Sequence, residues 1–162
     1  MPESEKPRRL TLLYQLYLAS TESRQFMRLA LRDTDMSGEE YGIYSYFYAN
    51  GPRTQSQASV DLGYAVTTLA SLLAPIIESG DLVRRPHPTD RRARLLELTP
   101  DGRLRLESAI PAFTDAYQAL LAELEAAGAD TEAIFTALAT LREGVAATIR
   151  RLEAGLTDEE RS

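Results

Sequence analysis

Residues 51–102 read GPRTQSQASVDLGYAVTTLASLLAPIIESGDLVRRPHPTDRRARLLELTPDG, and their first half contains two short helical segments. Thr54 and Gln57 have the spacing of a capping box, which starts a helix, and Gly63 can end that helix in a left-handed conformation. Apolar residues at every third or fourth position then predict a second helix over 67–79. Two short helices joined by a turn that contains glycine predict a helix-turn-helix.

The second half of this stretch predicts a β-hairpin. Residues 81–85 and 93–98 have an extended pattern, and they flank a turn that is rich in proline and contains Thr-Asp. Thr99 then offers a hydroxyl cap, and Pro100 follows at the first position of a new helix. We therefore expect a basic hairpin directly between the helix-turn-helix and a long helix.

Long helices are predicted on both sides of this central stretch. Apolar residues with helical period predict one helix over 8–32 and another over 38–49, and residues 37–40 match a capping box. On the other side, helical period runs from 99 to about 127, with Pro111 as a possible site of a kink, and again over about 131–153. The predicted fold class is mainly α with a small β-hairpin.

Composition limits the possible functions. The chain of 162 residues suggests one domain, or one domain with an appended helical part. It contains no cysteine and one histidine, His87, so thiolate and histidine-built metal sites are not expected. No catalytic constellation and no cofactor motif can be found, so we do not expect an enzyme. No apolar run approaches about 20 residues, so we expect a cytoplasmic protein without a membrane partner.

Charge is distributed unevenly along the chain. The net charge is −6, yet residues 84–105 hold seven Arg against three Asp/Glu, and residues 106–162 hold four Arg against eleven acidic residues. Five arginines fall within residues 84–94. Because binding to nucleic acid depends on the local field rather than on the total charge, an acidic protein can still carry a DNA-binding surface.

The order of these elements resembles the MarR family of winged helix-turn-helix transcriptional regulators, and the similarity covers nearly the whole chain. It is carried by residues 51–102, from the Gly-Pro before the helix-turn-helix to the Thr-Pro-x-Gly after the hairpin. The Asp-x-Arg of the family's wing falls on Asp90 and Arg92. Together and at this spacing, the three motifs are specific, whereas a helix-turn-helix pattern alone would be weak.

The resemblance implies a homodimer that binds pseudo-palindromic double-stranded DNA, with half-sites about one helical turn apart. Long dimerisation helices would lie at both ends of a winged helix-turn-helix. The implied division is 1–35 for the N-terminal dimerisation helix, 36–98 for the DNA-binding domain, 99–155 for the C-terminal dimerisation helices and 156–162 for a frayed tail.

In the wing, an arginine at the tip of the hairpin can enter a narrow minor groove, where the potential is most negative. We assign this role to Arg92, and we expect Asp90 to hold its guanidinium in place. Arg91 and Arg94 are expected to contact phosphates. The alternative is a solvated turn in which the Asp–Arg pair contributes little to stability. His87 is expected to be simply exposed.

The expected recognition helix is unusual because it has no Lys or Arg between Tyr64 and Ser79. Hydroxyls can bond to bases or phosphates, but they do not give the bidentate contact of arginine with guanine. The family often has arginine at the position of Ser71, and Pro75 is expected to bend the helix or to end it early. The candidate DNA contacts on this helix are Thr67, Thr68 and Ser71. Phosphate contacts are predicted for Arg53, Gln55 and Gln57, with capping as the equal alternative.

Members of the family bind phenolic or lipophilic effectors between the dimerisation helices and the winged-helix lobe. Tyrosines offer a flat apolar wall with a polar tip, and arginines could pair with a ligand carboxylate. An aromatic stripe at helical spacing is nevertheless often core or dimer interface. The candidate effector residues are Tyr14, Tyr17, Tyr41, Tyr44, Tyr48, Arg24 and Arg28.

Two functions remain open from the sequence. The first is a ligand-responsive regulator, most simply a repressor that an aromatic or lipophilic effector releases from DNA. The second is a MarR-like dimer that has lost specific DNA reading and serves as a ligand-binding or protein-interaction module. The uncharged recognition helix and the acidic balance favour the second, whereas the wing favours the first.

Overall fold

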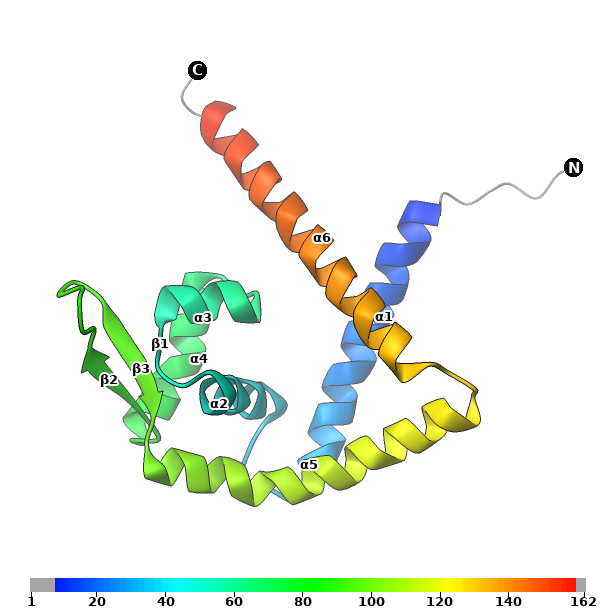
Figure 1. The fold of residues 1–162 in the computed structure, drawn as a ribbon, viewed down its shortest axis with the longest axis horizontal. Helices are drawn as coiled ribbons and strands as arrows, with labels where there is room; N and C mark the ends of the chain where they lie inside the picture. Colours follow the sequence, from blue (N-terminus) through cyan, green and yellow to red (C-terminus); the bar gives the residue numbers. More distant parts are fainter. Residues whose placement is uncertain (1–7, 160–162) are drawn as a thin grey trace, which may run out of the picture. The chain divides into compact units, whose positions relative to one another are not determined.

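The computed structural model describes residues 8–159, so residues 1–7 and 160–162, including the last part of the expected tail, lie outside the described residues. The chain forms two compact units, Met1–Ala116 and Tyr117–Ser162. Figure 1 shows the element order. The elements are α1 (Arg8–Ala30), α2 (Gly38–Asn50), β1 (Arg53–Thr54), α3 (Gln55–Leu62), α4 (Val66–Glu78), β2 (Leu82–Pro86), β3 (Arg94–Leu98), α5 (Pro100–Ala126) and α6 (Thr131–Glu159).

The predicted helix boundaries are confirmed where capping residues defined them. The side chain of Ser37 accepts from the backbone N–H of Glu40, and the Glu40 carboxylate accepts from that of Ser37. Thr54 and Gln57 form the same reciprocal pair at the start of α3. Gly63 ends α3 with a φ of 73°, in the left-handed region that favours glycine. These short local bonds define where α2 and α3 begin and where α3 ends.

The predicted hairpin is confirmed, but it belongs to a sheet of three strands. β2 and β3 pair antiparallel in a register that sets Leu82 opposite Leu98. β1 pairs antiparallel with the other edge of β3, with Arg53 opposite Leu96, and the strand order is β1-β3-β2. The sequence did not predict β1 because two residues give no alternating pattern.

The core of the first unit lies beneath the helix-turn-helix and the sheet. Tyr44 and Phe47 of α2, Leu69 and Leu73 of α4, and Leu96 of β3 are each at most 2% exposed. The apolar stripe of α4 therefore faces inward, which leaves its hydroxyl-bearing face in solvent. Gly102, in the first turn of α5, lies so close to the backbone of Asp81 that a Cβ there would be 2.3 Å from the Asp81 oxygen.

One helix end differs from the expectations. α6 runs to Glu159 rather than to about residue 153. Pro111 lies within α5 without ending it. Among the described residues, no single helix is long and apolar enough to span a membrane; only α3 and α4 together, bent by 112° at their break, have that length and composition.

Candidate nucleic-acid interface

The tip of the wing is organised by side chains that accept hydrogen bonds from the backbone. The Nδ1 atom of His87 accepts from the backbone N–H of Asp90 at 3.1 Å. The Oδ1 atom of Asp90 accepts from the backbone N–H of Arg92 at 2.9 Å, and the Ala93 N–H donates to the Asp90 carbonyl at 3.2 Å. This chain of bonds defines the path of residues 87–93 between the strands.

The structure gives Asp90 a different contact from the one we expected. Its carboxylate bonds to the backbone of Arg92, and no ion pair joins it to the Arg92 guanidinium within residues 8–159. Asp90 thus shapes the turn rather than the arginine side chain, which stays exposed. The role of His87 was missed, although an acceptor side chain three residues before an amide, in a turn between prolines, is a usable signal.

The arginines of the wing fall into two groups. Arg85 donates through Nε to Glu97 on the neighbouring strand, so part of its charge is neutralised within the hairpin. Arg91, Arg92 and Arg94 are exposed at or beside the turn. Arg84, also exposed, lies beside Arg85 on β2. The wing therefore presents three exposed arginines at or beside its turn and carries Arg84 and the Arg85–Glu97 pair along its strands.

The exposed face of α4 carries hydroxyls. Thr67, Thr68 and Ser71 are all exposed, while Leu69 and Leu73 on the opposite face are fully buried. The Ser71 hydroxyl donates to the Thr67 carbonyl at 3.2 Å, so its proton is already engaged and its oxygen remains an acceptor. The face can make contacts of hydroxyl and methyl type, but it carries no cation.

The three candidate phosphate contacts before and within α3 have structural roles. Gln57 closes the capping box with Thr54. The Gln55 Nε2 donates to the Val66 carbonyl at 3.3 Å, which ties the start of α3 to the start of α4. Arg53 Nη1 donates to the carbonyl of Pro52 at 3.0 Å. Of these bonds, only the Gln55 bond links α3 to α4, and the capping alternative is realised for Gln57.

An open cavity of about 920 Å³ lies in the first unit, at the end of α1 and the start of α2. Arg24 and Arg28 of α1, two of the candidate effector residues, line it, and so does Arg32 in the turn that follows α1. Arg32 is paired with Asp33 at 3.1 Å. The remaining lining combines apolar and acidic side chains, among them Met27, Leu31, Met36, Asp35, Glu39 and Tyr64.

None of the five candidate tyrosines lines this cavity. Tyr44 is 1% exposed, and its hydroxyl donates to Asp81 Oδ2 at 2.7 Å. Burial, and then the bond to Asp81, raise the Tyr44 pKa well above its ordinary value. The Tyr41 ring stacks on Phe113 at 4.6 Å, while Tyr48 is partly covered by Arg103. Tyr14 and Tyr17 are 58% and 64% exposed on α1.

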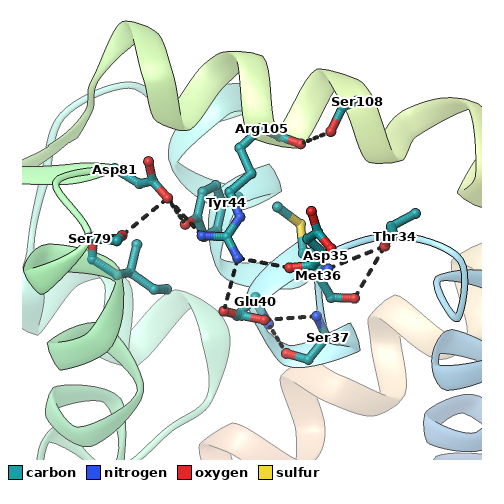
Figure 2. Close-up of polar contacts among 11 residues, drawn as sticks. Thr34, Asp35, Met36, Ser37, Glu40, Tyr44, Ser79, Asp81, Arg105 and Ser108 are labelled. Carbon is teal, nitrogen blue, oxygen red and sulfur yellow. Dashed lines mark hydrogen bonds and ion pairs between the residues drawn. The ribbon is translucent and has the colours of Figure 1, made fainter.

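A polar cluster that the sequence did not reveal joins α4, α5 and the root of the wing (Figure 2). The Asp81 carboxylate accepts from Tyr44, from Ser79 at 3.1 Å and from Arg105 Nη1 at 3.0 Å. Arg105 also donates through Nη2 to the carbonyl of Asp35 at 2.8 Å. Asp81 follows a glycine and precedes a strand, so by sequence it resembles any turn aspartate.

The comparisons with known proteins concern the fold. No protein-family profile and no curated protein matches the sequence. Solved structures do match, including the repressor CouR bound to a 23-mer DNA duplex, with a TM-score of 0.71 and 23% identity over 87% of this chain and 99% of the other. The regulator BldR from Sulfolobus solfataricus matches with a TM-score of 0.73 and 17% identity over 87% and 99%.

A cysteine-to-serine variant of MarR from E. coli in complex with operator DNA matches with a TM-score of 0.69 and 16% identity over 87% of this chain and 98% of the other. All three proteins are transcriptional regulators, and two of the three are solved on DNA. Their arrangement of helices around a small three-stranded antiparallel sheet is the one found here. This chain has the winged-helix fold of the MarR family of transcriptional regulators.

Proposed function

We propose that this chain is a DNA-binding transcriptional regulator of the MarR type, which acts in the cytoplasm as a homodimer and as a repressor that a small molecule releases. The observation that carries the proposal is the wing tip. Arg91, Arg92 and Arg94 are exposed on a turn whose backbone is fixed by His87 and Asp90. A fixed, cationic hairpin tip next to an exposed helix face fits a minor groove beside a major groove.

Exposed apolar side chains support the homodimer. On α1, Leu12, Leu13, Tyr14 and Tyr17 are more than half exposed. In the second unit, Phe135 is 75% and Leu152 is 64% exposed on α6. A second copy that covered these residues would remove apolar surface from water, and a two-fold axis would set two wings against consecutive half-sites.

The cavity supports the response to a ligand. Its apolar floor of Met27, Leu31 and Met36 suits an aromatic or lipophilic body, and Arg24 and Arg28 can pair with a carboxylate on such a ligand. A ligand that binds better to a conformation whose wings no longer fit the operator would release DNA by population shift. The ligand class expected from the lining is therefore an aromatic or lipophilic carboxylate.

The test is a mobility-shift titration against the DNA upstream of the protein's own coding sequence. Non-specific competitor DNA is added, and the titration is repeated at several salt concentrations. We expect a discrete complex that resists competitor and weakens steeply with salt, because arginine–phosphate contacts release counterions. Binding that competitor removes in full would contradict specific recognition.

The second candidate is a MarR-like dimer that has lost specific reading and acts as a ligand-binding or interaction module. The uncharged face of α4 favours it, since the Ser71 proton is engaged by Thr67 and no cation is available to read guanine. The same titration separates the two candidates: equal affinity for upstream and unrelated DNA supports the module.

A further inference from the structure

Arg105 contacts two parts of the first unit that are far apart in sequence. Its Nη2 donates to the carbonyl of Asp35 at 2.8 Å, in the turn between α1 and α2. Its Nη1 donates to Asp81 Oδ2 at 3.0 Å, at the root of the wing. Figure 2 shows the guanidinium between these two partners, reached from α5. One side chain therefore bridges the turn and the wing root.

The turn that Arg105 holds is also a wall of the cavity. Asp35, Met36 and Ser37 all line the cavity, and Asp35 is the residue that carries the carbonyl bonded to Arg105. Met36 is 5% exposed and packs in the core, so it cannot shift freely. A ligand that displaces this turn must move the Asp35 carbonyl, and with it one of the two partners of Arg105.

Several hydrogen bonds fix Asp81 at the root of the wing. The Asp81 carboxylate is bonded by Tyr44, by Ser79 at the end of α4 and by Arg105, and it has an 11% exposed side chain. The backbone carbonyl of Asp81 accepts from the Thr99 N–H at 3.0 Å. Gly102, in the first turn of α5, packs against the same backbone carbonyl. Because β2 begins at the next residue, a displaced Asp81 carboxylate changes the attachment of the wing to α4.

We infer that Arg105 is the positioning residue that transmits occupation of the cavity to the root of the wing. This inference rests on the proposed function, because it names how the ligand site and the DNA-contacting wing are coupled. The guanidinium suits this role, since its planar fork directs two donors to two partners at once, whereas the ammonium of lysine is a compact charge. Glu40 makes a longer ion pair with the same guanidinium, because its Oε1 lies 3.9 Å from Arg105 Nη2.

The test places a known group in the cavity, so no natural ligand has to be identified. The chain has no cysteine, and Ser23 is an exposed lining residue, so Ser23→Cys offers a single thiol there. Benzyl methanethiosulfonate converts this thiol to a benzyl disulfide, which should place the benzyl group in the cavity. The matched control is Glu22→Cys with the same label, because Glu22 is exposed on the same helix and does not line the cavity.

Two readouts are taken, each with Arg105 and with Arg105→Gln. The first is hydrogen exchange of the backbone amides of 82–98, which requires no DNA. The second is Kd for the upstream DNA. With Arg105, the label at residue 23 should accelerate wing exchange and raise Kd by at least about fivefold, in the usual range for coupling between sites. With Arg105→Gln both changes should disappear, and the label at residue 22 should have no effect.

Ser79→Ala is the control for damage at the wing root. It removes a hydrogen bond to the same Asp81 oxygen but leaves the bridge to Asp35, so the label effect should persist. Arg105→Lys, which keeps the charge, should lose the label effect as Arg105→Gln does, and thermal melts test whether each variant folds. If Arg105→Gln does not fold, Arg105→Lys decides.

The outcomes separate the inference from the proposed function. An equal label effect with and without Arg105, or no effect on wing exchange in the protein with Arg105, overturns the inference. Absence of DNA binding by the unlabelled protein overturns the proposed function alone, because the exchange readout still reports whether the cavity and the wing are coupled.

Discussion

The wing and helix α4 lie next to each other in the chain, yet their exposed surfaces differ in chemistry. The wing tip exposes Arg91, Arg92 and Arg94, whereas the outer face of α4 exposes Thr67, Thr68 and Ser71. Charged contacts supply affinity that is largely independent of sequence, and contacts with base edges supply discrimination. Under the proposed function, we therefore expect affinity for DNA to come chiefly from the wing and sequence discrimination to be modest.

The two regions are also held in place by different forces. α4 is positioned by burial of Leu69, Leu73 and Ile76 in the core. The wing tip has no such core, and its turn is held by the hydrogen bonds of His87 and Asp90. Single polar substitutions should therefore affect the wing tip more than the exposed face of α4.

The largest effect is expected from Arg92→Ala. Loss of a guanidinium from a narrow groove should raise Kd for the upstream DNA by roughly 10- to 100-fold, since a well-placed arginine contact is worth about 1–3 kcal/mol. The matched change on α4, Ser71→Ala, should raise Kd by less than about threefold, because it removes one hydroxyl contact. Fluorescence anisotropy at constant salt measures both. Equal losses would mean that α4 contributes as much affinity as the wing.

The second prediction adds charge to α4. Ser71→Arg places a guanidinium on the exposed face, at a position where it could contact guanine O6 and N7, so it should lower Kd for a suitable operator by about tenfold. Competition with operators that differ in one base pair shows whether the gain is specific. A gain that is the same for all operators would reflect phosphate contacts, and it would mean that the exposed face of α4 does not recognise bases.

The third prediction concerns the order of the wing tip. His87→Ala removes the acceptor for the Asp90 N–H. The DNA-binding conformation of the turn should then be less stable by about 1 kcal/mol, so Kd should rise about fivefold. His87→Asn should restore most of the affinity, because an asparagine oxygen can accept from a backbone amide nearby. The melting temperature should be nearly unchanged in both variants. If His87→Ala bound DNA as well as wild type, the turn would not depend on this bond.

Most of the fold could be predicted because its signals are local. The capping pairs at Ser37 and Thr54, the glycine that ends α3 and the Thr-Pro start of α5 each act within four residues of sequence. The strand β1 could not be predicted, since two residues have no pattern and their pairing with β3 depends on tertiary structure.

The candidate site was harder to predict, because side-chain partners are not visible in a linear pattern. Asp90 and Arg92 were correctly placed together in the turn, but the carboxylate bonds to the backbone rather than to the guanidinium. Tyr44 was taken for a wall of an effector site, yet it is buried and bonded to an aspartate 37 residues away. Arg105 and Asp81, 24 residues apart, had no signal that linked them.

The smallest effect on DNA binding is expected at Asp81, where the two regions share an anchor, and its signature is the pH dependence of stability. Burial opposes ionisation of this carboxyl, but the hydrogen bonds from Tyr44, Arg105 and Ser79 outweigh it, so its pKa lies below the ordinary value of 3.8. The resulting stability is fully present above the unfolded pKa and is lost as the pH falls through the folded pKa. Asp81→Asn should therefore lower the free energy of unfolding at neutral pH and flatten its decline below about pH 4. Urea titrations followed by far-ultraviolet circular dichroism between pH 7 and pH 3 measure this difference. Because Asp81 joins the end of α4 to the start of β2, hydrogen exchange in acid should increase in both regions together; an increase confined to the wing would show that the two regions have separate anchors.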